Sequence, residues 1–393
     1  MKEIKLGDIA VSITDGKHGD CENAERSGFY FVSCKDIHDG IIDYTNARQI
    51  TQRDFEDTHR RTKLEPNDIL ITNSGTIGRM ALVKEQEETK HTTFQKSVAI
   101  VKPDKEQVLP RYLYYALLNC VKEFINRSNG SAQKNLLLGT MRNFTFNIHE
   151  DFEDQERIAA ILSAYDDLIE NNKQQIKLLE EMAQRLYKEW FVDLHFPGYE
   201  DVPVVDSVPK GWRKLPLSEI ADVVMGQSPK SEFYNDNHEG LPFHQGVGTY
   251  GRRFVVDSTY SSSLTKIAEA GSILFSVRAP VGRLNFTKNK IVIGRGLAGM
   301  KEKDGHQSFL FYMLKERFFK DDLVGNGSIF ASISKNELLD QMFVVPTDGL
   351  KCLFDNYVHS IDEKINALDS QITRLTEARD RLLPKLMSGE IKI

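Results

Sequence analysis

The chain has 393 residues, of which 40% are hydrophobic and 27% charged, values typical of a folded globular protein large enough for two domains. No apolar run approaches the ~18 residues needed to cross a bilayer, and residues 1–8 lack the apolar core of a secretory signal. We therefore expect a cytoplasmic protein whose four cysteines are reduced. The net charge of −6 neither requires nor excludes a nucleic-acid partner, because binding depends on where basic side chains cluster.

The chain opens on a module predicted for residues 1–150. Short β-branched and aromatic runs at 29–32, 69–72 and 98–101 predict strands. Segment 111–125 predicts an amphipathic helix lying on that sheet, and clusters of Gly and Asn mark the turns. We predict an α/β module with a curved, mostly antiparallel sheet.

A long helix is predicted next, within the spacer segment 151–195. Its apolar residues recur at alternating steps of four and three, which is the spacing of a heptad seam. The seam consists of Ile158, Leu162, Tyr165, Ile169, Asn172, Ile176 and Leu179, followed by Ala183, Leu186 and Trp190.

Pro and Gly residues in 196–211 predict a linker, after which a second module is expected at 212–346. Its strand at 273–275 and helix at 308–319 resemble elements of the first module. A second long helix is predicted within 347–393. Its seam has the same phase and consists of Phe354, Val358, Ile361, Ile365, Leu368, Ile372, Leu375 and Arg379, followed by Leu382 and Leu386.

Two helices with matching seams are expected to pack against each other as a coiled coil within the chain. Asn172 and Arg379 interrupt the seams with polar groups, which cost stability but fix register. Each helix would be on the order of 50 Å long, more than the ~34–36 Å of one turn of DNA. The predicted fold is thus α+β, with two α/β modules separated by a rigid helical spacer.

The second half of the chain repeats the first. Residues 68–79 correspond to 272–283, and the aromatic run at 112–115 corresponds to 309–312. An Asn-Gly-Ser motif also recurs, at 129 and again at 326. A duplicated module with its own helix suits a protein that contacts two places at a fixed distance, which favours binding over catalysis.

Two motifs suggest a cofactor but are better explained otherwise. His18, Cys21, Cys34 and His38 are zinc-ligand types, yet the second module has no matching set, so core thiols and loop histidines are favoured. Residues 246–251 fit G-x-G-x-x-G without the preceding strand of a dinucleotide-binding unit, which favours a turn-rich loop. We predict no catalytic residue, metal or cofactor site in this chain.

The loops of the repeat are the candidate binding surface. Exposed backbone amides can donate hydrogen bonds to phosphates, and Arg, Lys, Asn and Gln side chains can form hydrogen bonds with base edges. Any one glycine in them is typical of a hairpin turn, but the recurrence of whole loops favours a functional face. The predicted DNA-contacting residues are Lys17, His18, Thr76, Arg79, Lys96, Ser131, Gln133 and Lys134 in the first module and Gln227, Ser228, Lys230, Arg278, Arg283, Arg295 and Ser328 in the second.

Taken together, the chain resembles the specificity (S) subunits of type I restriction-modification systems, over essentially its whole length. The order and duplication of the motifs carry this resemblance, since no single motif decides it. The motifs lie at 15–18, 31–37, 68–78, 226–229 and 240–243, and at the module ends 155–159, 190–193 and 382–391.

The resemblance implies two target-recognition domains, each reading one half of a bipartite asymmetric DNA site. It also implies that the helices dock two methyltransferase (M) subunits, and that restriction and translocation (R) subunits join the complex. S-adenosylmethionine, ATP and Mg²⁺ are expected on those partners. Two alternatives are a coiled-coil scaffold joining two protein-binding modules and a self-contained DNA-modifying enzyme. The enzyme is disfavoured because the chain has neither an S-adenosylmethionine loop nor an Asn-Pro-Pro-Tyr-like motif.

Overall fold

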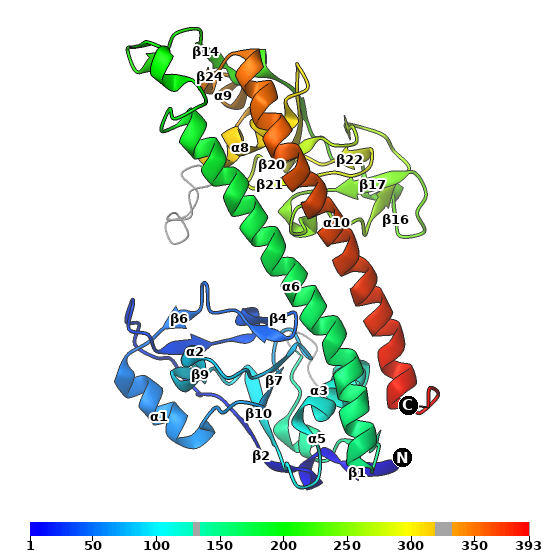
Figure 1. Cartoon of the computed structure of the whole chain (residues 1–393). Coiled ribbons are helices and arrows are strands. Elements are labelled where there is room, and N and C mark those ends of the chain that lie inside the picture. Colours follow the sequence, from blue (N-terminus) through cyan, green and yellow to red (C-terminus); the bar gives the residue numbers. More distant parts are fainter. Residues whose placement is uncertain (129–133, 319–331, 393) are drawn as a thin grey trace. The chain divides into compact units, whose positions relative to one another are not determined.

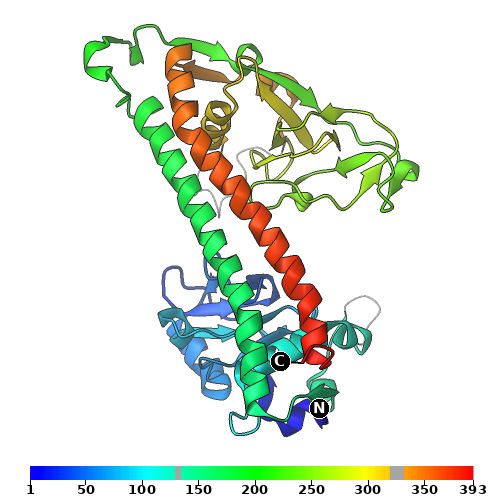
Figure 2. The ribbon, with the colours of Figure 1, turned by 45° about the vertical axis from the view of Figure 1, so that its right-hand side comes forward.

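The computed structural model of the chain describes residues 1–128, 134–318 and 332–392 (Figures 1 and 2). They form two compact units. Unit 1 comprises Met1–Glu170 with Thr373–Ile393, and unit 2 comprises Asn171–Ile372. Each unit therefore contains part of both long helices, α6 (Phe152–Phe191) and α10 (Asp348–Met387). Among the described residues, no helix is long and apolar enough to span a membrane.

Unit 1 is built around a four-stranded antiparallel sheet in the order β2-β10-β7-β8. A three-stranded sheet, β6-β3-β9, and two strand pairs, β1-β11 and β4-β5, accompany it. The strands are β1 (Lys2–Lys5), β2 (Ala10–Asp15), β3 (Tyr30–Val32), β4 (Ile37–His38), β5 (Ile41–Ile42), β6 (Arg48–Gln49), β7 (Ile69–Thr72), β8 (Met80–Leu82), β9 (Thr92–Phe94), β10 (Val98–Pro103) and β11 (Thr145–Ile148). The helices, besides parts of α6 and α10, are α1 (Gln52–Thr62), α2 (Glu87–Lys90), α3 (Pro110–Asn119), α4 (Val121–Asn126) and α5 (Leu138–Arg142).

Both faces of this sheet are buried at its centre, which explains why β7 and the first four residues of β10 are almost entirely apolar. Successive side chains of a strand point to opposite faces. Ile69 and Ile71 accordingly join the core beneath α3 and α5, which also includes residues of α6 and α10. Leu70 joins a second core with Val32 and Phe94 of the three-stranded sheet.

Unit 2 has a four-stranded antiparallel sheet in the order β15-β23-β20-β21. A five-stranded sheet, β16-β18-β17-β22-β19, and the pairs β12-β13 and β14-β24 complete it. The strands are β12 (Val204–Val205), β13 (Val208–Pro209), β14 (Arg213–Pro216), β15 (Ala221–Met225), β16 (Tyr234–Asn235), β17 (Leu241–His244), β18 (Tyr260–Ser261), β19 (Ile267–Ala268), β20 (Ile273–Ser276), β21 (Leu284–Phe286), β22 (Ile291–Ile293), β23 (Leu297–Glu302) and β24 (Met342–Val345). The helices, besides parts of α6 and α10, are α7 (Leu217–Ile220), α8 (Gln307–Phe318) and α9 (Lys335–Leu339).

The predicted internal repeat is confirmed in the order of the strands. The sheet β2-β10-β7-β8 of unit 1 corresponds to β15-β23-β20-β21 of unit 2, and the pair β1-β11 corresponds to β14-β24. Pairing is mostly antiparallel, as predicted. The exceptions among the named strand pairs are β3-β9 and β17-β22, which are parallel and occupy corresponding places in the two units.

The helix predicted at 111–125 differs in detail from the structure. It is divided into α3 and α4, and the break lies at Cys120, whose backbone leaves helical geometry. The helix predicted at 308–319 corresponds to α8, which ends at Phe318, and residue 319 lies outside the described residues.

Segments of α6 and α10 lie side by side and antiparallel within each unit (Figures 1 and 2). In unit 1, Arg379 of α10 forms an ion pair with Asp166 of α6 (2.6 Å). In unit 2, the Asn172 amide donates to the Gln371 side-chain oxygen (3.3 Å). Both polar interruptions of the seams thus have a partner on the other helix.

The seam residues line the packed faces of these helices. Buried members are Ile158, Leu162, Ile169, Asn172, Ile176, Ala183 and Trp190 on α6 and Phe354, Val358, Ile361, Ile365, Leu368, Ile372 and Leu386 on α10. Half-buried members are Tyr165, Leu179, Leu375 and Arg379.

One seam position near the end of each helix is displaced by one residue, although the next seam residues, Trp190 and Leu386, are buried as predicted. Tyr187 is buried where the heptad repeat placed Leu186, and Leu383 is buried where it placed Leu382. A straight helix drifts by roughly 20° per heptad relative to a seven-residue repeat. Over four heptads this drift approaches the ~100° between adjacent residues, so the buried face widens to include neighbours of the seam such as Phe191 and Met387.

Candidate nucleic-acid interface

The candidate loops of the first module meet at one end of its four-stranded sheet. Because β2, β10 and β7 are antiparallel neighbours, the end of β2, the start of β10 and the end of β7 lie together. A β-bridge between Ser74 and Asn135 adds a fourth segment. We define the loop end of unit 1 as residues 16–18, 73–79, 95–97 and 134–135.

Backbone hydrogen bonds hold the loop end of unit 1 together. The Lys17 amide donates to the Phe94 carbonyl (2.8 Å), and the Lys96 amide donates to the Lys17 carbonyl (3.1 Å). The Asn73 amide donates to the Ser97 carbonyl (3.0 Å). The side chains on these loops therefore start from fixed backbone positions.

Unit 2 has the same arrangement at the corresponding end of its sheet. The Gln227 amide donates to the Ile293 carbonyl (2.9 Å), and the Val277 amide donates to the Gly296 carbonyl (2.9 Å). Arg278 bridges to Ser332 as Ser74 does to Asn135 in unit 1. We define the loop end of unit 2 as residues 226–228, 277–283, 294–296 and 332–333.

A close backbone approach explains the glycine that begins each loop end. A Cβ at Gly16 would lie 1.9 Å from the Phe94 carbonyl oxygen, and one at Gly226 would lie 2.1 Å from the Gly294 carbonyl oxygen. No side chain fits at such distances, so only glycine permits the loops to pack in this way.

Gly78 and Gly282 form hairpin turns, which is the structural role expected of any one glycine in these loops. Their φ angles are 88° and 86°, in the left-handed region that favours glycine. After each of them, the amide of the next residue donates to a strand hydroxyl, from Arg79 to Thr72 (2.9 Å) and from Arg283 to Ser276 (2.8 Å).

Most of the predicted contact side chains of unit 1 are exposed at its loop end. Thr76, Arg79, Lys96 and Lys134 are all exposed. His18 is also exposed, and its ring lies 2.9 Å from a carboxylate oxygen of Asp15. The basic members of this set give the loop end a local positive charge despite the negative net charge of the chain.

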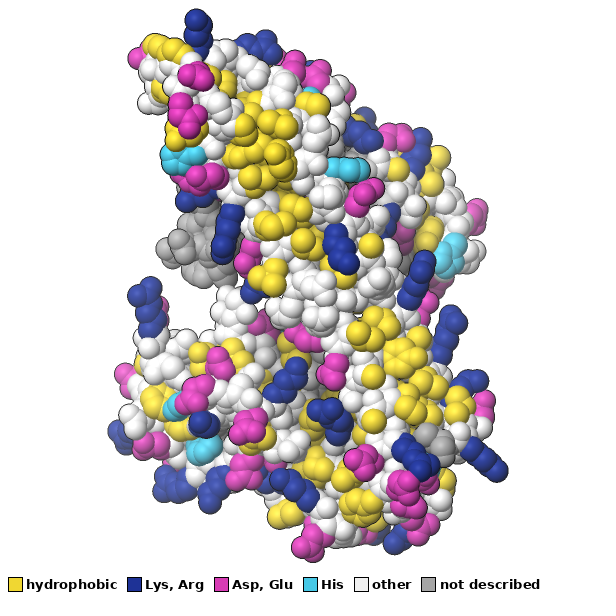
Figure 3. Space-filling view, viewed as in Figure 1, with side chains coloured by type: hydrophobic (Ala, Val, Ile, Leu, Met, Phe, Trp, Pro, Cys, Tyr) yellow, Lys and Arg dark blue, Asp and Glu magenta, His cyan; other side chains and the backbone are white. Residues whose placement is uncertain are grey.

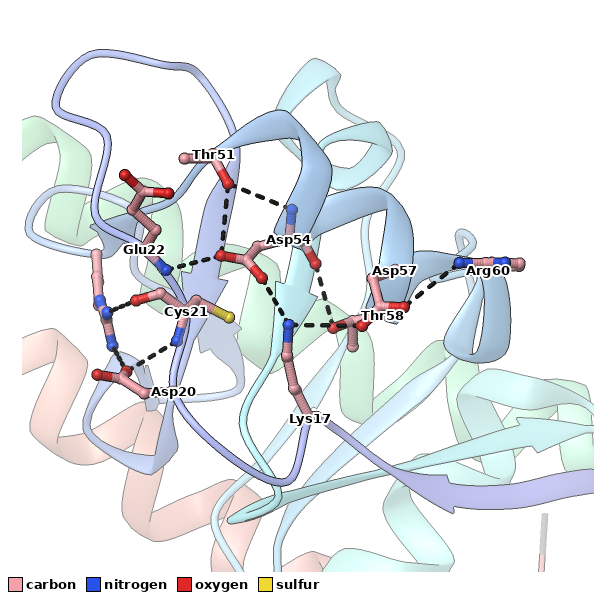
Figure 4. A network of polar contacts seen from close by, with 10 residues as sticks. Lys17, Asp20, Cys21, Glu22, Thr51, Asp54, Asp57, Thr58 and Arg60 are labelled. Carbon is pink, nitrogen blue, oxygen red and sulfur yellow. Dashed lines mark hydrogen bonds and ion pairs between the residues drawn. The ribbon is translucent and has the colours of Figure 1, made fainter.

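Lys17 differs from the others because its ammonium group is already paired. It lies 2.6 Å from Asp54 and 3.5 Å from Asp57, both on α1, and only 18% of its side chain is exposed (Figure 4). The hydrogen bond to Asp54 raises the pKa of Lys17, although burial opposes the shift. Lys17 therefore fastens its loop to α1, and DNA contact by this side chain stays a prediction.

The predicted contact residues of unit 2 divide into exposed and partly buried groups. Gln227, Lys230, Arg278 and Arg295 are exposed. Ser228 is half-buried and donates to the Gln245 side-chain oxygen (2.7 Å).

A cavity lies directly at the loop end of unit 2. Arg278 and Arg295 line it together with Ser334 and Glu337. Arg283 is half-buried and lines a different cavity, so the structure does not group it with Arg278 and Arg295.

Three predicted contact residues lie outside the described residues. They are Ser131 and Gln133 of the first module and Ser328 of the second.

The four potential zinc ligands of the first module have other surroundings. Cys21 packs in a small apolar core with Phe31 and Ile50. The His38 ring lies 3.3 Å from Asp43. Within the described residues, no group of three metal-ligating side chains forms.

Each unit also joins its helix α3 or α8 to the long helices through a buried polar cluster. In unit 1 the Tyr115 hydroxyl of α3 donates to Asp166 (2.6 Å), the residue that pairs with Arg379. Burial and the Asp166 carboxylate raise the pKa of Tyr115, so this hydroxyl remains a donor.

In unit 2 the corresponding cluster centres on Arg253, whose side chain is only 3% exposed. Its guanidinium lies 2.6 Å from Asp362 of α10 and 3.2 Å from Glu180 of α6. It also lies 4.0 Å from the ring centroid of Phe311 on α8. Burial alone would lower the pKa of Arg253, but its neighbours outweigh that effect and the pKa is raised.

The chain matches the model of one known protein family. The model of the type I restriction modification DNA specificity domain matches it twice, at residues 1–181 and 209–349. The chain belongs to this family.

The two matches correspond to the duplicated modules, each with its loop end. Relatives extend over nearly the same length. A type I restriction enzyme MjaIX specificity subunit from Methanocaldococcus jannaschii is 27% identical, and the alignment covers 92% of this chain and 87% of the relative. The HindI specificity subunit from Haemophilus influenzae is 26% identical, over 74% of this chain and 80% of the relative.

A solved structure supports the fold. The crystal structure of a type I restriction-modification S subunit from M. genitalium aligns with a TM-score of 0.55 and 16% identity. The alignment covers 98% of this chain and 96% of that one. This alignment over nearly the full length of both chains supports the overall fold described above.

The sequence pattern alone indicates no special role for Arg253 or Asp166. Arg253 adjoins Arg252 in a basic pair, and Asp166 adjoins Asp167 on a helix, so both have the appearance of surface charges. The signal available for Asp166 was its position beside Tyr165 in the seam, which places it at the margin of a buried face.

Proposed function

We propose that this chain is the DNA sequence-specificity subunit of a type I restriction-modification complex. The loop end of unit 1 reads one half of a bipartite asymmetric site, and the loop end of unit 2 reads the other half. The observation that carries the proposal is the duplicated loop end, built on the same backbone hydrogen bonds in both units and bearing exposed basic side chains. Basic groups on ordered loops suit phosphate and base-edge contacts.

The chemistry of the complex is assigned to partner subunits. Methyltransferase subunits bind S-adenosylmethionine and methylate adenine N6, and restriction subunits use ATP and Mg²⁺. This chain is non-catalytic and selects the sequence on which its partners act. Its membership in the specificity-domain family supports this division.

The paired helices dock the methyltransferase subunits. Besides their buried seams, α6 and α10 expose apolar side chains, and large exposed apolar groups in proximity are typical of interaction sites. In unit 2 these include Leu178 (62% exposed) and Met182 (50%) on α6 and Tyr357 (57%) on α10. Figure 3 shows hydrophobic side chains gathered over the helical segments of unit 2. Leu178 and Met182 are four residues apart and so share one helix face.

We predict that Arg278→Ala relaxes recognition at one half-site and leaves the other unchanged. Loss of a good base contact typically weakens discrimination by about 1–3 kcal/mol, or roughly tenfold to a hundredfold. The measurement is binding of the complex assembled with methyltransferase to duplexes in which each half-site is randomised separately. Equal loss at both half-sites would indicate damage to the fold instead.

The salt dependence of binding separates this function from the alternative of a scaffold for two protein-binding modules. A DNA-recognition complex loses affinity steeply as salt rises, because phosphate contacts release counterions. A scaffold would show no DNA binding, or binding that salt does not change, even with its partners present.

A further inference from the structure

The backbone hydrogen bonds of the two loop ends define which residues of the units are equivalent. The bond from Lys17 to Phe94 corresponds to that from Gln227 to Ile293, with lengths of 2.8 and 2.9 Å. Position 96 lies two residues after Phe94, and position 295 lies two residues after Ile293. Lys96 is therefore equivalent to Arg295.

A second pair of bonds fixes another equivalence. The Asn73 amide donates to the Ser97 carbonyl (3.0 Å), and the Val277 amide donates to the Gly296 carbonyl (2.9 Å). Ser97 and Gly296 are equivalent because they directly follow Lys96 and Arg295. The next residue in each unit forms a β-bridge, from Ser74 to Asn135 and from Arg278 to Ser332. Ser74 is therefore equivalent to Arg278.

The first equivalent pair has the same chemistry in both units. Lys96 and Arg295 are both cationic and exposed, and each lies two residues before the first residue of a central strand, β10 or β23. Among the described residues, no carboxylate forms an ion pair with either side chain. Their neighbour Lys17, in contrast, is paired with Asp54.

The second equivalent pair differs in chemistry. Ser74 carries a short hydroxyl, whereas Arg278 carries a planar guanidinium that is exposed beside Arg295 and lines the same cavity. Arg suits bidentate contact with guanine, while Ser is compatible with several bases. The same backbone position thus presents a different recognition group in each unit.

We propose that Lys96 and Arg295 are equivalent phosphate-contacting residues, one in each unit, and that position 74 in unit 1 and position 278 in unit 2 determine the base preference of each half-site. This inference rests on the proposed function. Phosphates are the same at every sequence, so both units can use one contact for them, whereas an asymmetric site requires different groups at the base edges.

The test uses the chain assembled with its methyltransferase and three variants, Lys96→Gln, Arg295→Gln and Arg278→Ser. Affinity is measured against salt concentration for the cognate duplex and for duplexes altered in one half-site. Lys105→Gln and Lys301→Gln serve as matched controls, because both lysines are exposed and lie toward the opposite ends of the same strands. Thermal unfolding of each variant verifies that the fold is intact.

We expect Lys96→Gln and Arg295→Gln each to weaken binding to all these duplexes by a similar factor. Each should also reduce the slope of log K against log[salt] by about 1. We expect Arg278→Ser to reduce discrimination at the half-site of unit 2 by roughly tenfold to a hundredfold. Lys105→Gln and Lys301→Gln should change neither the affinity nor the discrimination between duplexes.

Opposite behaviour would overturn the inference. That result would be a changed sequence preference in Lys96→Gln or Arg295→Gln, or an equal loss on all duplexes in Arg278→Ser. The unmodified complex distinguishes this failure from failure of the proposed function. If it does not discriminate between cognate and altered duplexes, the proposed function itself is wrong.

Discussion

Leu368→Asp is expected to disrupt the paired helical segments of unit 2 and to abolish assembly with the methyltransferase. Leu368 is 2% exposed in the seam of α10. The substitution removes a burial term of about 1.5–3 kcal/mol and places a carboxylate where desolvation costs several kcal/mol more. A total near 5 kcal/mol is comparable to the whole stability of many domains. The measurements are calorimetric unfolding of the chain and co-purification with the methyltransferase.

Ile169→Asp should have the same effect in unit 1, where Ile169 is 6% exposed on α6. Neighbouring surface positions supply the controls. Asn366 is exposed two residues before Leu368, and Leu168 is 50% exposed beside Ile169. Asn366→Asp and Leu168→Asp should leave the unfolding temperature nearly unchanged. A stable, fully assembled complex carrying Leu368→Asp would refute the role assigned to the seam.

Arg253→Ala is expected to destabilise unit 2 by about 3 kcal/mol or more, because it leaves two carboxylates without their buried partner. Asp362 and Glu180 come from α10 and α6, so the loss also frees the module from both helices. For a unit of this size the midpoint of thermal unfolding should fall by roughly 6–12 °C. Calorimetry of the complete chain measures this shift.

Arg252→Ala is the matched control for Arg253→Ala. Arg252 is the preceding residue, and its guanidinium makes a longer contact with Asp369, 3.5 Å, at a more exposed site. Exposed pairs of this kind contribute about 0–1 kcal/mol, so the control should move the midpoint by no more than a few degrees. Equal effects of the two substitutions would show that the Arg253 cluster has no special role. Adding Glu180→Gln and Asp362→Asn to Arg253→Met should restore part of the lost stability.

The features predicted correctly from sequence are those that depend on local pattern. The runs at 69–71 and 98–101 are apolar at every residue, because both faces of the sheet are buried there, and the strands predicted at 69–72 and 98–101 form β7 and β10 as expected. The heptad spacing likewise predicted two matching long helices. It missed the burial of Tyr187 beside the half-buried seam residue Leu186, because a seven-residue repeat ignores the drift of a straight helix, but it placed Trp190 correctly.

Features that depend on distant pairing were not predictable from the same signals. Strands of two or three residues, such as β6 and β9, have too few positions to show periodicity. The partner of Lys17 is Asp54, 37 residues away, and nothing in the spacing of the two predicts their ion pair. The Arg253 cluster joins residues 73 and 109 positions apart for the same reason. The equivalence of Lys96 and Arg295 required the backbone hydrogen bonds, whereas that of Ser74 and Arg278 already follows from the alignment of 68–79 with 272–283.

The most direct test of two-module recognition is a genome-wide map of methylated adenine in a host without its own methylation. The host expresses this chain with the methyltransferase encoded beside it, and a parallel culture lacks the chain. We predict one bipartite motif with a fixed gap, present only when the chain is expressed. An absence of methylation from a complex shown to assemble, or a motif with a single contiguous half, would contradict recognition by two modules.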